Sequence, residues 1–307
     1  MLSQVIQAFE MLSDAKVTGE DVAKVVKEMG LNTIEVKTLQ EISTTHFIKA
    51  LVPGTDGKST GGKASTLGVI GNLGGVGARP EIIGLVSDAD GAIAALSVLF
   101  KLITMQKCGD FLKGDIILTT HICPNAPTIP HDPVPFMGNP TKKTITKTKH
   151  YVDPGMDAIV HIETSRGNRV INCRGFAITP TIKECYVLRV SDDLMDIMHT
   201  VTGQVPAIVP VTTQDVTPID NGLFHVNGLA QETVVTDAPI VGVALTSVVP
   251  VAGCATGASQ IMDIEMASRF TIEVAKAFTA GKCKFFDEVE FRKLLDLYGS
   301  MKHLRKI

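Results

Sequence analysis

The sequence contains no tryptophan and only three tyrosines, and none of its six cysteines stands in a CxxC pair. Structural zinc knots need cysteines or histidines at close spacing, so such a knot is not expected here. Reduced thiols are the expectation in the cytoplasm, and we predict no disulfide.

The chain also lacks a strong net charge and a long hydrophobic run. Its formal charge is -3 at pH 7 and its pI is near 6.2, which gives no electrostatic reason to bind nucleic acid or an anionic membrane. No apolar stretch is long enough to cross a bilayer, and the N-terminal region has acidic residues and helical periodicity instead of a secretory signal. We expect a cytoplasmic protein, with a solvated hairpin at the one lysine cluster, Lys142, Lys143, Lys147 and Lys149.

Several motifs of known chemistry are missing from the sequence. It has no HExxH, no nucleophile elbow and no phosphate-loop lysine motif. The glycines of residues 71–80 (GNLGGVGARP) lack the GxGxxG spacing and precede a strand, which disfavours dinucleotide binding. The segment CATGAS (254–259) is better interpreted as a small-residue turn than as a cysteine nucleophile.

What the sequence does contain is an alternation of strand-like and helical segments. Periodicity predicts two helices over residues 3–30, a long helix from about 90 to 105, and later helices over 192–203 and 262–281. Apolar or β-rich runs predict strands at 33–39, 45–53, 66–73, 81–87, 114–120 and 156–165, in 169–190, and at 207–213 (AIVPVTT) and 239–249. This alternation predicts an α/β fold with a mostly parallel or mixed central sheet and helices on both faces. We expect a single domain, 1–307, with an N-terminal helical cover (1–32) and a proline-rich insertion (121–155).

Polar side chains recur where these predicted strands end, and ligands of open α/β sheets bind at the carboxyl ends of strands. The side chains concerned are Asp88, Asp90, His121, His161, Glu163, Gln214 and Asp215. Carboxylates and imidazoles that converge from several strands can bind one or two divalent metals.

Each of these residues also has a simpler interpretation. Asp88 or Asp90 would serve as the N-cap of the following helix, and a single histidine beside a strand, such as His161, is usually structural. His121 is better placed for function, because it precedes a loop that prolines stiffen. A further polar string, QDVTPIDNGLFHVN, predicts a loop that contacts substrate or a second subunit, through Gln214, Asn221, His225 and Asn227.

Long segments of the chain resemble a known family. GNLGGVGARPEIIGLVSDADGAIAAL, THICPNAPTIPHDPVPFM, GNRVINCRGFAITPT and TTQDVTPIDNGLFHVN are similar to the bacterial family described only as domain of unknown function 1177. The similarity covers nearly the whole chain, and that family has no established activity to carry over.

A second resemblance concerns the fold. The order of SDADGAIAALSVLFKL, IILTTH and DAIVHIETS is similar to that of co-catalytic zinc aminopeptidases and deacylases. The resemblance implies that Asp90 (or Asp88) matches the bridging carboxylate, that His121 stands where paired glutamates belong, and that Glu163 takes the place of a later aspartate. The Glu-Glu pair and the late histidine are absent, so either His131, His161 or His225 replaces them or the scaffold has lost its metal.

These observations predict a metal-dependent hydrolase of small peptides or amides, similar to aminopeptidases, with a divalent metal, zinc in first place. Asp88, Asp90, His121 and Glu163 are the predicted metal ligands, and Asp215 or His131 would transfer protons. The resembled peptidases imply a homo-oligomer. The alternative is a non-catalytic protein that binds a metabolite or assembles through the 214–227 loop on a degenerate peptidase scaffold.

Overall fold

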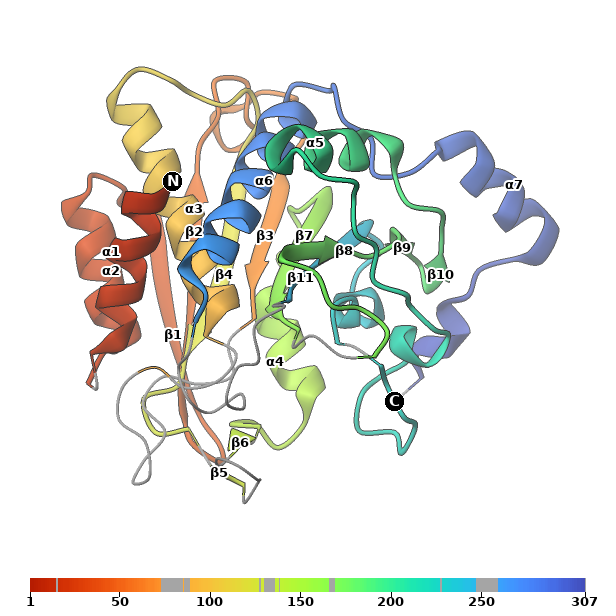
Figure 1. Cartoon of the computed structure of the whole chain (residues 1–307), viewed down its shortest axis with the longest axis horizontal. Helices are drawn as coiled ribbons and strands as arrows, with labels where there is room; N and C mark the ends of the chain where they lie inside the picture. The colour runs from red at the N-terminus through yellow and green to blue at the C-terminus, as the bar shows by residue number, and fades with distance from the viewer. Residues whose placement is uncertain are drawn as a thin grey trace.

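The computed structural model describes residues 1–14, 16–72, 85, 89–126, 128–129, 136–137, 139–165, 169–226, 228–246 and 259–306, in the arrangement of Figure 1. The predicted positions Asp88, His131, Asn227 and Cys254 lie outside these residues, as does most of the predicted strand 81–87.

The centre of the fold is a nine-stranded mixed sheet, whose main path runs β1-β2-β4-β3-β7-β11-β9-β10, with β8 paired to β11. Four neighbouring strands at its centre are parallel: β4 (Ile116–Ile122), β3 (Leu67–Gly71), β7 (Ala158–Thr164) and β11 (Ile240–Thr246). The strands that flank them pair antiparallel: β1 (Ile34–Gln40), β2 (Thr44–Val52), β8 (Gly175–Ile178), β9 (Ile182–Lys183) and β10 (Tyr186–Val187). A separate short pair joins β5 (Thr128–Ile129) to β6 (Phe136–Met137). The predicted α/β class with a mostly parallel or mixed sheet is confirmed.

One face of the sheet carries the main hydrophobic core. The helices α1 (Leu2–Ser13), α3 (Asp90–Lys107), α5 (Asp192–Thr202) and α6 (Ile261–Thr279) lie on this face (Figure 1) and contribute most of the helical side chains of the core. The sheet contributes Val69, Leu118, Val160 and Val241, which occupy matching positions on adjacent strands and so point to the same side.

The opposite face is covered by the short helix α4 (Thr144–Tyr151) and by the 3-10 helix η3 (Gln231–Val234). A smaller apolar cluster forms there, with Tyr151 packed among Phe47, Ile70, Ile117 and Ile159. The polar side chains of the candidate site lie on this second face, at the ends of the parallel strands.

The two predicted N-terminal helices are present, α1 and α2 (Gly19–Glu28). Thr18 and Asp21 form a capping box at the start of α2, as the acidic first turn after Thr18 suggests. Gly30 follows with a φ of 96°, a backbone conformation that glycine adopts without strain.

Three local predictions are wrong. The lysine cluster belongs to α4 and its N-terminal flank, not to a hairpin; the apolar contacts of Tyr151 hold this segment as a helix on the sheet. The run AIVPVTT forms only a bridge between Ile208 and Ile178, because Pro206 and Pro210 have no N–H to donate to a ladder. Asp90 is the first residue of α3 and not its cap; Ala89 occupies the N-cap position without a side-chain bond.

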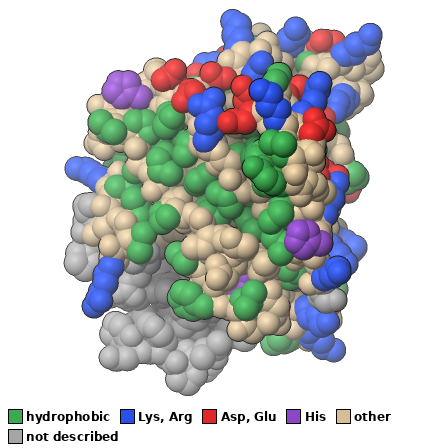
Figure 2. Space-filling view, turned by 90° about the vertical axis from the view of Figure 1, so that its right-hand side faces the viewer, with side chains coloured by type: hydrophobic (Ala, Val, Ile, Leu, Met, Phe, Trp, Pro, Cys, Tyr) green, Lys and Arg blue, Asp and Glu red, His purple; other side chains and the backbone are tan. Residues whose placement is uncertain are grey.

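The last long helix, α7 (Glu288–Tyr298), has no counterpart among the predicted helices and projects from the side of the molecule (Figure 1). Figure 2 faces this side and shows charged side chains of both signs gathered at the top, with hydrophobic side chains spread below them. The exposed apolar side chains of α7 are Val289, Leu297 and Tyr298. Among the described helices, none combines the length and apolar character that a membrane span requires.

Candidate metal centre at the strand ends

The parallel strands β4, β3 and β7 bring three polar side chains together at their carboxyl ends. Gly71 pairs with Thr120 on one side and with Ile162 on the other, so the next residues along these strands are Asn72, His121 and Glu163. Because side chains alternate between the faces of a strand, these three point to the face that α4 covers. His121 and Glu163 both lie within strands instead of following them.

A hydrogen-bonded path begins at His121, whose side chain is fully buried. The Tyr151 hydroxyl contacts His121 Nδ1 and donates to Asn72 Oδ1 at 3.0 Å. Since that hydroxyl has one proton, His121 carries its own proton on Nδ1 and leaves Nε2 as a bare acceptor. Burial lowers the pKa of His121 well below its ordinary value, and Lys147 lowers it further, so the ring is neutral.

The path continues across the sheet to a second histidine. Asn72 Nδ2 donates to Glu163 Oε1 at 2.9 Å, and the other oxygen, Glu163 Oε2, lies 3.8 Å from His161 Nε2. On its far side, His161 Nδ1 lies 2.9 Å from Glu232 Oε2 of η3. We call these six residues, His121, Tyr151, Asn72, Glu163, His161 and Glu232, the strand-end network.

His161 is held between two carboxylates. Burial alone would lower its pKa, but the Glu232 carboxylate, through charge and hydrogen bond, and the Glu163 carboxylate raise it above the ordinary value. The ring is 1% exposed and Glu232 is 2% exposed, so water screens this attraction little. The space between His161 Nε2 and Glu163 Oε2 therefore favours a positive charge.

Three atoms of the strand-end network are buried without a hydrogen-bond partner in the described part of the chain: His121 Nε2, His161 Nε2 and Glu163 Oε2. Buried polar atoms are normally paired, and those that are not call for an explanation such as a bound ion. All three atoms are of the kinds that bind divalent metals. Two bonds of about 2.1 Å to one cation, at an angle between tetrahedral and linear, span about 3.4–4.2 Å. The 3.8 Å between His161 Nε2 and Glu163 Oε2 lies in that range.

Asp90 lies at the same edge, on the side of α3. A Cβ on its neighbour Gly91 would lie 2.3 Å from the Asn72 carbonyl oxygen and 2.5 Å from that of Ile162, so the start of α3 packs directly onto the ends of β3 and β7. Burial raises the pKa of Asp90 to about 6, against a hydrogen bond from Ser259. The Asp263 carboxylate, in the first turn of α6, raises it further.

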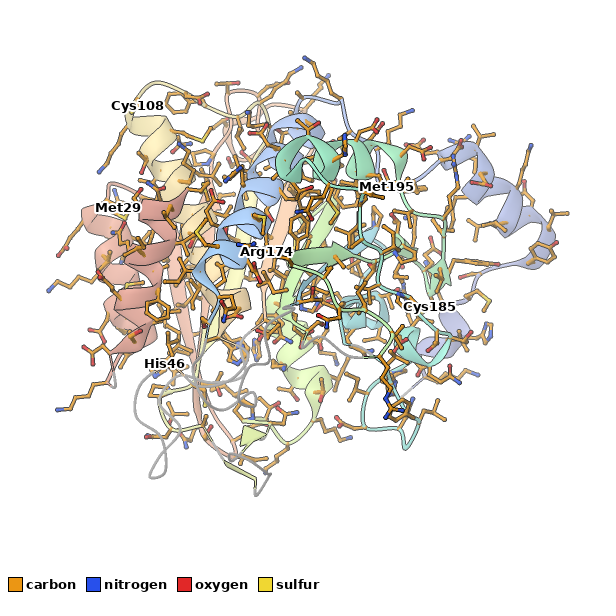
Figure 3. The ribbon with its side chains drawn as sticks, viewed as in Figure 1. Met29, His46, Cys108, Arg174, Cys185 and Met195 are labelled. Atoms are coloured by element: carbon orange, nitrogen blue, oxygen red, sulfur yellow. The ribbon has the colours of Figure 1, made fainter. Side chains whose placement is uncertain are left out.

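Asp263 has its own charged neighbour in Arg174, which Figure 3 shows beside the first turn of α6. Over the residues that the structure describes, no three His, Cys, Asp or Glu side chains are grouped closely enough to form a complete metal site.

The predicted proton-transfer and substrate residues of the 214–226 loop have local contacts. Asp215 is fully buried, and its Oδ2 accepts hydrogen bonds from the backbone N–H and hydroxyl of Thr212. Asn221 donates to Thr217 Oγ1, and His225 Nε2 lies 3.2 Å from the same oxygen. Gln214 is exposed. The catalytic role of Asp215 and the substrate roles of Gln214, Asn221 and His225 stay predictions.

Sequence reasoning missed three members of the strand-end network. Asn72 lies near the end of the predicted strand 66–73, so a search for polar side chains at strand ends could have found it. Tyr151 comes from α4, which begins within the lysine cluster where the sequence predicts a hairpin, and Glu232 lies in a segment without regular periodicity. Neither of these two left a signal in the sequence.

A family model described as "Protein of unknown function (DUF1177)" matches residues 36–307. The chain belongs to this family. The resemblance to domain of unknown function 1177 is thereby confirmed. A search of curated proteins by sequence found no match.

Solved structures similar to this DUF1177 chain share its fold at low identity. The bottromycin maturation enzyme BotP is 14% identical, with a TM-score of 0.53, over 91% of this chain and 70% of BotP. A structure of BotP in complex with Mn is 13% identical, with a TM-score of 0.51, over 90% and 70%. A mutant of tomato leucine aminopeptidase is 13% identical, with a TM-score of 0.50, over 88% and 60%. The fold is therefore the aminopeptidase-like α/β fold.

Proposed function

We propose that this DUF1177 chain is a metal-dependent hydrolase that acts on a small peptide or amide. The observation that carries the proposal is a pair of buried atoms, His161 Nε2 and Glu163 Oε2, which lie 3.8 Å apart at the end of β7 and have no hydrogen-bond partner among the residues that the structure describes. This edge is where open α/β sheets bind ligands, and one solved structure with the same fold is a complex with Mn.

In this proposal Glu163 and His161 hold a divalent cation, zinc in first place. Asp88, Asp90 and His121 are the further proposed ligands, which would have to move closer to this pair, since among the described residues no three such side chains are grouped closely enough to form a complete site. Such a cation supplies Lewis-acid polarisation of an amide carbonyl. Asn72 keeps one oxygen of Glu163 engaged and thereby directs the other toward His161. Asp215 or His131 is the proposed proton-transfer residue.

The proposal extends to location and assembly. We propose a cytoplasmic homo-oligomer, and the exposed Val289, Leu297 and Tyr298 of α7 are side chains that would favour a contact between copies.

Hydrolysis of aminoacyl p-nitroanilides and dipeptide amides tests the proposal. Purified untagged protein is assayed after addition of Zn²⁺ or Mn²⁺ and again after chelation. We expect turnover that the chelator abolishes and that Glu163→Gln lowers by at least about a hundredfold, because loss of a metal ligand removes the electrostatic stabilisation that the cation would supply in the transition state.

Glu265→Gln is the matched control, because it removes a buried carboxylate that pairs with Arg269 on α6. No turnover on any substrate, combined with saturable metal binding, would instead favour the non-catalytic binding protein on the same scaffold.

A further inference from the structure

Glu232 has a place in the strand-end network that its packing does not explain. Its carboxylate is 2% exposed, and in the described part of the chain its one hydrogen-bond partner is His161 Nδ1, at 2.9 Å. A buried carboxylate–imidazole pair stabilises a fold little more than apolar side chains of similar volume would. The fold of η3 therefore does not itself require an ionised group at this position.

The contact does determine which nitrogen of His161 is available. A carboxylate accepts hydrogen bonds and donates none, so the proton of the neutral ring lies on Nδ1 and is donated to Glu232. The lone pair of Nε2 is then directed away from Glu232, toward the space where Glu163 Oε2 lies. With the opposite tautomer, Nε2 would carry a hydrogen and could not bind a metal.

We infer that Glu232 is a positioning residue, which fixes the ring and tautomer of His161 so that Nε2 serves as a metal ligand. This inference rests on the proposed function. The arrangement, a carboxylate behind a histidine that binds metal through its other nitrogen, is one in which loss of the carboxylate typically lowers metal affinity by about 10–100-fold.

The position of Glu232 in the chain supports a role beyond local folding. It lies 71 residues from His161, on a 3-10 helix of four residues that has no side-chain cap. The neighbouring Gln231 is also buried and donates to the carbonyl oxygen of Asp215. That bond fixes η3 to the preceding loop independently of Glu232.

Two variants separate the charge of the Glu232 side chain from its ability to accept a hydrogen bond. Glu232→Gln keeps an oxygen that can accept the Nδ1 hydrogen but removes the charge, whereas Glu232→Leu removes both. Calorimetric titration with Zn²⁺ and with Mn²⁺ measures the affinity of wild type, both variants and the control Glu265→Gln. Long-range ¹H–¹⁵N correlation of the metal-free wild-type protein, recorded at a pH above the raised pKa of His161 so that the ring is neutral, reports which nitrogen of His161 is protonated, and it needs no variant to fold.

We expect Glu232→Leu to weaken metal binding about 10–100-fold, Glu232→Gln to fall between it and wild type, and Glu265→Gln to match wild type. We also expect the spectrum to show the hydrogen of His161 on Nδ1. Wild-type affinity in Glu232→Leu, or a neutral His161 with its hydrogen on Nε2, overturns the inference while the proposed function stands. Absence of metal binding by the wild-type protein overturns both.

Discussion

Replacing Gly91 by alanine tests the packing that brings α3 onto the strand ends. Helix propensity alone favours alanine over glycine inside a helix by about 0.5–1 kcal/mol. The structure predicts the opposite sign, because the added Cβ would lie 2.3 Å and 2.5 Å from two carbonyl oxygens, where ordinary contact begins at 3.4 Å. Both oxygens belong to the backbone at the ends of β3 and β7, so α3 itself must move.

Overpacking of this kind costs about 1–3 kcal/mol, which leaves a net destabilisation of about 0–2.5 kcal/mol after the gain in propensity. For a chain of this size the melting temperature should fall by up to about 4 °C, as measured by calorimetry or circular dichroism. Gly228→Ala is the control, since a Cβ there meets nothing nearer than 3.6 Å, and it should not lower the melting temperature. If Gly91→Ala and Gly228→Ala melt at the same temperature, α3 does not pack directly onto the ends of β3 and β7.

Three further predictions concern other parts of the molecule. Tyr151→Phe removes the hydroxyl between His121 and Asn72 and should lower the free energy of unfolding by about 1–3 kcal/mol, since it leaves buried polar groups unpaired. An unchanged midpoint of urea unfolding would contradict the hydrogen-bonded path from His121 to Asn72. Cys108 is exposed at the outer end of α3 (Figure 3), whereas burial raises the pKa of Cys283 to about 12; in native protein at pH 8, Cys108→Ser should therefore remove a rapidly labelled thiol and Cys283→Ser should not. Burial opposes ionisation of Asp237, but Lys302 and Arg305 lower its pKa below the ordinary value, so its stabilisation is present above pH ~4 and is lost as the pH falls through the lowered pKa. Asp237→Asn should accordingly cost less than about 1 kcal/mol at pH 7, because the Asp237 side chain is 54% exposed and water screens its ion pairs, and it should cost nothing near pH ~2 in urea titrations. A larger cost in acid would contradict the ion pairs.

The sequence predicted the elements that depend on local pattern. The two helices predicted over residues 3–30 are present, and Gly203 ends the predicted helix 192–203 (α5) in the left-handed conformation that glycine favours. The alternation of side chains along β7 also places His161 and Glu163 on one face, because a spacing of two residues returns to the same side of a strand.

What the sequence could not predict depends on contacts between distant segments. The contact between Glu232 and His161 crosses 71 residues, and the one between Asn72 and Glu163 crosses 91; no periodicity encodes either. The strand predicted at 207–213 is wrong for a different reason. Its apolar residues favour a strand, but its prolines prevent a ladder. The interpretation of His161 as a structural histidine did not include Glu232, whose carboxylate comes from a segment 71 residues away.

Equilibrium binding of Zn²⁺ and Mn²⁺ to wild-type protein and to Glu163→Gln, by calorimetry on protein purified without a histidine tag, tests the central claim most directly. The account predicts saturable binding of at least about one equivalent by the wild type and a loss of that binding in Glu163→Gln, with both proteins equally folded. Less than about a tenth of an equivalent bound by the wild type, or equal affinity in the two proteins, would contradict it.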